Sequence, residues 1–147
     1  MDVGNRNGWL HEMSTRADFA EDVLLTGGWP QHLNNHVALV AWMEGENTLA
    51  KYNPFATSHP MDGATDFNSS GVKNYVSFSQ GVQATVDTIR LARYAEIVKN
   101  LEEHSSAFYT LTAVEASGTW TQFDNLSTFV EAVRTSWTRY AFKSIAT

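Results

Sequence analysis

The stretch from His36 to Glu46 constrains the fold most, because it is apolar on almost every side of a helix. Residues 37–43 read Val-Ala-Leu-Val-Ala-Trp-Met, and Asn34-Asn35 just before them offers a helix N-cap. A helix that is hydrophobic all round has to be covered on all sides, so this pattern predicts a buried central helix. The rest of the chain must then wrap around residues 36–46.

The helical spacing of apolar residues predicts the elements that cover this central helix. One helix starts at Ser14 to Asp18 and ends at Gly27-Gly28; further helices are expected over 79–91, 97–101 and 105–115, and a last one from Asp124 to Tyr140. The region 47–79 has no helical period, and 72–76 alternates weakly, which favours a loop with a small β-hairpin. We predict a mainly α (α+β) fold with five or six helices around the buried helix and a small β-hairpin/loop insert.

The chain length predicts the number of domains, and the net charge limits the classes of partner. The chain has 147 residues, 43% of them hydrophobic, which suits a single domain over 14–147 after a loose, Gly- and Asn-containing lead-in over 1–13. The formal net charge is −6, whereas nucleic acids and anionic membranes usually bind basic patches. We therefore expect no nucleic-acid and no membrane partner, and a neutral substrate such as a glycan suits this charge better.

The chain contains no cysteine, so disulfides and thiolate chemistry are excluded. No apolar run is long enough for a membrane span, and no signal peptide is recognised, so a product made in the cytoplasm is expected. His32 and His36 have metal-ligand spacing, but Pro30 puts His32 before the helix and no third ligand is evident. We expect no metal and no cofactor.

Two carboxylates, Glu44 and Glu46, end the predicted buried helix. A carboxyl there loses solvent and meets the negative end of the helix dipole, and both effects favour the protonated form that a proton donor needs. Glu46 shares a face with Trp42, while Glu44 lies about 200° around the helix, on the side of Val40. Helical geometry leaves the choice between them open, and so does the plain alternative that each merely ends the helix in water.

Several motifs in one order carry a resemblance. Residues 34–46, with Trp42 four positions before Glu46, are followed by Tyr52-Asn53-Pro54-Phe55-Ala56-Thr57, by 64–75, and by Arg93-Tyr94. This order resembles lysozyme-like (muramidase/transglycosylase-type) domains of actinobacteriophage lysins and virion-associated proteins, over roughly 18–120 and most densely over 34–98. The resemblance implies a lysozyme-like fold with Glu46 as general acid. Such domains often have Gly after this Glu, whereas Asn47 follows it here, which leaves a degenerate, inactive member open.

The resemblance and the chemistry of glycosidases together imply further site residues. Glycosidases use a second carboxylate, and Asp66 is the candidate base or nucleophile. If none faces Glu46, a lytic transglycosylase, in which one Glu serves as acid and then as base, is the alternative. Tyr75 is the expected support residue. The expected substrate-binding residues, chosen because aromatic and hydrogen-bonding side chains suit sugars, are Trp42, Asn53, Thr57, Asn68, Ser70 and Asn74.

Two functions stay open from the sequence. The first is cleavage of peptidoglycan glycan strands by a muramidase or lytic transglycosylase that acts at the cell wall after lysis or from a phage virion. The second is a non-catalytic phage structural or cell-wall-binding module on a lysozyme-like fold. The expected partner is the peptidoglycan glycan strand, with phage virion proteins as further candidates.

Overall fold

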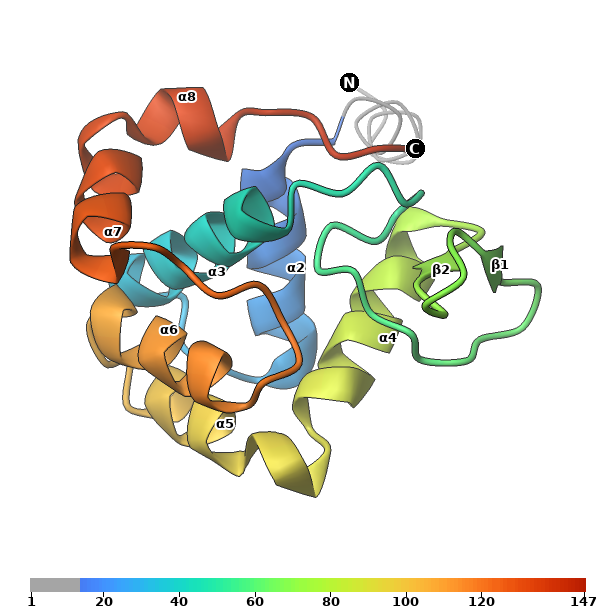
Figure 1. The fold of residues 1–147 in the computed structure, drawn as a ribbon, viewed down its shortest axis with the longest axis horizontal. Helices are drawn as coiled ribbons and strands as arrows, with labels where there is room; N and C mark the ends of the chain where they lie inside the picture. The colour runs from blue at the N-terminus through green and yellow to red at the C-terminus, as the bar shows by residue number, and fades with distance from the viewer. Residues whose placement is uncertain (1–13) are drawn as a thin grey trace.

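The structure is a computed structural model that describes residues 14–147; the predicted lead-in over 1–13 lies outside the described residues. The described chain is mainly helical, with seven α-helices, one 3-10 helix and two short strands (Figure 1). The elements in order are α2 (Arg16–Gly27), α3 (Leu33–Glu46), β1 (Thr65–Asp66), β2 (Lys73–Asn74), α4 (Phe78–Ile89), η1 (Ala92–Tyr94), α5 (Ala95–Glu102), α6 (Ala107–Ala116), α7 (Leu126–Thr135) and α8 (Trp137–Ala141).

Helix α3 forms the centre of the molecule, as its apolar sequence predicts. Every residue from Val37 to Met43 is at most 1% exposed, and α2, α6, α7 and α8 all pack against this helix (Figure 1). The helix begins earlier than predicted, at Leu33, because the His32 imidazole Nδ1 accepts a hydrogen bond from the Asn34 N–H at 3.0 Å. The core of the protein is therefore built around α3.

Two other helix boundaries differ from the prediction because a different side chain caps the helix. Ser77, not Ser79, caps α4, since its Oγ accepts a hydrogen bond from the Gln80 N–H at 3.1 Å. Asn125, not Asp124, caps α7 through a 3.2 Å hydrogen bond from the Thr128 N–H. In both cases the capping side chain satisfies a helix N–H that has no partner within the helix.

The prediction of one last helix over 124–140 is wrong, because the chain leaves helical geometry at Ser136 (φ −108°, ψ 45°). Helix α8 then turns back over the molecule and packs Trp137 and Tyr140 against the core, with Ala141 fully buried. The chain after α8 pairs with the start of α2, since the Ile145 N–H donates to the Ser14 carbonyl at 3.0 Å. This pairing brings the C-terminal segment to the end of α3.

Residues 47–77 form the expected loop insert with a small antiparallel hairpin. Its strands have two residues each, with Thr65 opposite Asn74, so the predicted strand over 72–76 is shorter than expected. The hairpin lies at the right edge of Figure 1, beyond the start of α4, whereas α3 ends near the middle. A Cβ at Gly81 would lie 1.9 Å from the Tyr52 carbonyl oxygen, so only glycine lets the insert pass this close to α4. No helix within residues 14–147 is long and apolar enough to cross a membrane.

Candidate active site at the end of the buried helix

The two glutamates that end α3 have different surroundings. The Arg16 guanidinium forms an ion pair with Glu44 Oε1, and the Lys143 ammonium lies 3.8 Å from the same oxygen. The Arg16 side chain is only 6% exposed, so this pair is largely withdrawn from water. Glu44 thus joins α2, α3 and the C-terminal segment through its two cationic partners. Its role is structural.

Glu46 is half-buried, and within residues 14–147 no lysine or arginine forms an ion pair with it. Its Oε2 accepts a hydrogen bond from the Thr121 N–H at 2.9 Å. Burial raises the pKa of Glu46, and the hydrogen bonds from the Thr121 backbone and side chain oppose part of that rise. Glu46 therefore keeps its proton to a higher pH than an ordinary glutamate does, which suits a general acid.

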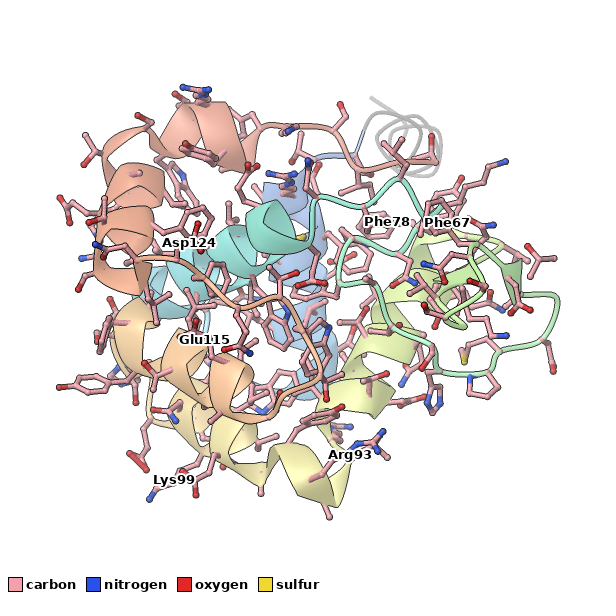
Figure 2. All side chains as sticks on the ribbon, in the orientation of Figure 1. Phe67, Phe78, Arg93, Lys99, Glu115 and Asp124 are labelled. Atoms are coloured by element: carbon pink, nitrogen blue, oxygen red, sulfur yellow. The ribbon has the colours of Figure 1, made fainter. Side chains whose placement is uncertain are left out.

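Thr121 belongs to residues 117–125, a segment we call the strap, which links α6 to α7 and crosses in front of α3 in Figure 1. The Trp120 Nε1–H donates to the Phe55 carbonyl at 2.7 Å, and the Tyr94 hydroxyl and Thr119 Oγ1 share a 2.7 Å hydrogen bond. On the other side of Thr121, the Phe123 N–H donates to Glu115 Oε2 at 2.8 Å. Figure 2 labels Glu115 on α6 and Asp124 at the far end of the strap. The strap is thus fixed on both sides of its contact with Glu46.

An aromatic cluster lies under the strap and holds Trp42 in the core. The Trp42 ring packs edge-on against Phe55 at 4.9 Å and against Trp120 at 4.7 Å between ring centroids. Trp42 is 0% exposed, so its ring offers no face to a ligand, and the expected substrate contact does not fit this placement. The ring instead supports the turn of α3 that precedes Glu46.

The residues beside Glu46 in the chain explain how the strap closes on α3. A Cβ on Gly45 would lie 2.6 Å from a carbon of the Phe123 ring, so the absence of a side chain at Gly45 lets Phe123 lie against the helix end. Asn47 ends the helix in the left-handed conformation (φ 41°, ψ 47°). Asn and Gly are the residues that adopt this conformation most readily, so Asn47 keeps the backbone geometry that a glycine there would give.

Two of the expected substrate-binding residues, Asn53 and Thr57, form a buried network with Tyr75, the expected support residue, and this network holds the insert together. The Asn53 Nδ2 donates to the Thr57 carbonyl at 2.9 Å and to the Lys73 carbonyl at 2.7 Å, and its Oδ1 accepts from the Thr57 N–H at 3.0 Å. The Tyr75 hydroxyl donates to the His59 carbonyl at 2.8 Å and lies 2.9 Å from Thr57 Oγ1, and burial raises its pKa. These side chains are at most 3% exposed, so they shape the insert and do not reach a ligand.

Asp66, the expected second carboxylate, belongs to the hairpin and not to the end of α3. Its Oδ1 forms a 2.6 Å ion pair with the Lys73 ammonium across the two strands, and its side chain is 68% exposed. Because the hairpin and the end of α3 lie well apart in Figure 1, the structure does not bring Asp66 beside Glu46. An exposed, cation-paired carboxylate at a distance cannot act as the base or nucleophile opposite Glu46 in this conformation.

The remaining expected contacts lie on the insert and mostly bond to its own backbone. Asn68 Oδ1 accepts hydrogen bonds from the Ser70 and Val72 N–H groups, both at 3.1 Å, and so forms the hairpin turn. Asn74 Oδ1 accepts from the Lys51 N–H at 2.9 Å. The Ser70 side chain is exposed. None of the three is placed against Glu46 by these contacts.

The strap, which contacts Glu46 through Thr121, is not among the elements predicted from the sequence. Trp120 and Phe123 are large aromatic residues in a segment introduced by Ser117-Gly118-Thr119, and such residues in a loop are a signal that the loop packs on the core. A hollow of about 480 Å³ opens between this segment and α7. Its lining residues include Glu44, Gly45, Phe123, Asn125, Thr128 and Phe129. The hollow therefore adjoins the end of α3.

Comparison with known proteins assigns no family, since no family model, curated protein or solved structure matches this chain. The resemblance to lysozyme-like domains therefore stays a prediction. The chemistry of the site rests on the burial of Glu46, on its hydrogen bonds from Thr121, and on the contrast with the ion-paired Glu44.

Proposed function

We propose that this protein cleaves the glycan strands of bacterial peptidoglycan, with Glu46 as the general acid. The observation that supports this most is the contrast between two glutamates two residues apart. Glu44 is held by two cations, whereas Glu46 is half-buried, has no cationic partner within the described part of the chain, and has a raised pKa. A carboxylic acid that is still protonated near its working pH is what cleavage of a glycosidic bond requires.

In the proposed reaction, the protonated Glu46 donates its proton to the glycosidic oxygen as the bond from that oxygen to the anomeric carbon breaks. The leaving sugar departs with a hydroxyl group, and positive charge develops on the ring that keeps the anomeric carbon. Glu46 is left as a carboxylate, which the Thr121 N–H stabilises through its hydrogen bond to Oε2. The same carboxylate can then act as a base in the second half of the reaction.

We favour the transglycosylase form of this reaction over hydrolysis with a second carboxylate. The reason is that Asp66, the predicted partner, is exposed and paired with Lys73 in the hairpin. In the transglycosylase form, Glu46 removes the proton from the 6-hydroxyl of the sugar while that oxygen attacks the anomeric carbon. The product has a 1,6-anhydro end, the proton returns to Glu46, and no water is consumed.

The protein is expected to meet its substrate at the cell wall, after host lysis or from a phage virion, as the resemblance implies. To test the reaction, purified peptidoglycan is incubated with the protein and the soluble products are analysed by mass spectrometry. Anhydro ends are expected, and reducing ends would indicate hydrolysis with Glu46 still as the acid. A protein that pellets with intact peptidoglycan and releases nothing would overturn the proposal in favour of a wall-binding module.

Two variants give this experiment its controls. Glu46→Gln keeps the shape of the side chain and removes the transferable proton, so it should release no products. Glu102→Gln makes the same chemical change at an exposed position on α5 and should release products as the parent protein does. Equal release by all three proteins would show that a contaminating enzyme or a different residue cleaves the glycan.

A further inference from the structure

Thr121 is the one residue within 14–147 that hydrogen-bonds the Glu46 carboxyl. Its backbone N–H donates a hydrogen bond to Glu46 Oε2 at 2.9 Å, and its side chain also lowers the pKa of that carboxyl. A donor on a fixed backbone restricts the rotation of the carboxyl, because the N–H cannot turn away as a free side chain can. Thr121 itself is exposed, so this contact lies at the surface end of α3 and not in the core.

The position of Thr121 is set by neighbours that do not touch Glu46. The residue before it, Trp120, is tied to the Phe55 carbonyl and packs on Trp42, while Phe123, two residues after it, is tied to Glu115. Phe123 also lies against Gly45, one residue before Glu46. The donor groups and the carboxyl are therefore held by the same small part of the structure, so little reorganisation is needed when the reaction starts.

We propose that Thr121 is the positioning residue of the acid: it aims the Glu46 carboxyl at the glycosidic oxygen and stabilises the carboxylate that remains after proton transfer. This inference rests on the proposed function for its catalytic meaning, and on the Thr121 N–H bond and the contacts of Trp120 and Phe123 for its geometry. Thr121 contacts Glu46 and affects the reaction only through Glu46. Its loss should therefore alter the protonation and the turnover of Glu46 more than the binding of glycan.

The test compares Thr121→Val, which removes the side-chain hydroxyl beside Glu46 and keeps the shape and the N–H, with Thr121→Ser, which retains a hydroxyl. Thr138→Val, on an exposed position of α8, is the matched control. For each protein, carbon-detected NMR follows the titration of the Glu46 carboxyl, and cleavage of a soluble peptidoglycan oligosaccharide gives kcat and KM across pH.

In Thr121→Val the Glu46 pKa should rise further, because the hydroxyl that lowers this pKa is lost, and the alkaline limb of the pH profile should move to higher pH with it. We expect kcat to fall roughly tenfold with little change in KM, as for a misaligned catalytic group. Thr121→Ser should restore both the titration and kcat, and Thr138→Val should alter neither.

An unchanged Glu46 titration in Thr121→Val would overturn the inference, and so would a rise in KM with kcat unchanged. If none of the proteins cleaves the oligosaccharide, the proposed function is wrong, whatever the role of Thr121. The NMR titration still decides whether Thr121 controls the proton of Glu46, because that measurement needs no substrate.

Discussion

Replacing Asn53 by alanine should destabilise the protein strongly, because Asn53 lies fully buried at the centre of the insert. The change removes two donated hydrogen bonds, to the Thr57 and Lys73 carbonyls at 2.9 and 2.7 Å, and one accepted from the Thr57 N–H at 3.0 Å. A longer hydrogen bond from the Thr57 hydroxyl at 3.3 Å is also lost, but that hydroxyl keeps the Tyr75 hydroxyl as a partner. At roughly 1 kcal/mol for each lost hydrogen bond, the free energy of unfolding should fall by about 3 kcal/mol. For a domain of this size that is a decrease in Tm of about 6–12 °C.

Chemical denaturation followed by tryptophan fluorescence measures this loss. The matched control is Asn68→Ala, which also removes hydrogen bonds to backbone groups, but in the exposed hairpin turn. Its free energy of unfolding should fall by less than about 1 kcal/mol. If Asn53→Ala unfolded at the same denaturant concentration as the parent protein and as Asn68→Ala, the network would not hold the insert. Asn53 would then again be a candidate for direct contact with sugar.

Three further changes test the surroundings of Glu46. Gly45→Ala should lower Tm and weaken the contact between the strap and α3, because the added Cβ would lie 2.6 Å from the Phe123 ring. In the double variant with Phe123→Ala, the geometry at the end of α3 should recover, but the aromatic packing of Phe123 stays lost. Thermal unfolding of both variants measures these effects. Arg16→Met should lower the free energy of unfolding by roughly 3 kcal/mol, measured by chemical denaturation, because it leaves Glu44 with Lys143 as its only cationic partner among residues 14–147. Arg16→Lys should lower it less, because it keeps the positive charge. Because the folded-state pKa of Glu46 is raised above the ordinary value of a glutamate, protonation of Glu46 stabilises the fold at low pH, and this stabilisation is lost as pH rises through the folded pKa. Unfolding curves across that range should show Glu46→Gln gaining stability relative to the parent as pH rises, and a constant difference would contradict the raised pKa.

The sequence predicts the centre of the fold well, because consecutive apolar residues indicate that α3 is buried. The run from Val37 to Met43 has no polar side, so any compact arrangement must cover it. The helix ends are less predictable, since neighbouring polar residues such as Ser77 and Ser79 can each act as a cap. Phe78, which lies between the two serines, is buried, and it is the Ser77 Oγ that accepts the capping hydrogen bond. The break at Ser136 occurs without a proline or glycine, and Trp137, directly after it, packs against the core.

The candidate site is predictable only in part because its deciding contacts come from distant parts of the chain. Helical geometry cannot separate Glu44 from Glu46, whereas Arg16, Lys143 and Thr121 do so in the folded protein. A polar residue such as Asn53 suits either sugar binding or a buried turn, and the sequence contains no signal that distinguishes these roles. Burial and hydrogen bonds assign Asn53, Thr57 and Tyr75 to the framework.

The most direct measurement of the central claim is the rate at which Glu46→Gln cleaves peptidoglycan, compared with the parent protein and with Glu102→Gln. General acid catalysis contributes about 10²–10⁴-fold, so the rate of Glu46→Gln should fall at least about a hundredfold. The variant should nevertheless unfold no earlier than the parent at neutral pH, because the amide removes a partly buried charge. A folded Glu46→Gln that cleaves peptidoglycan as fast as the parent would contradict the assignment of Glu46 as the acid.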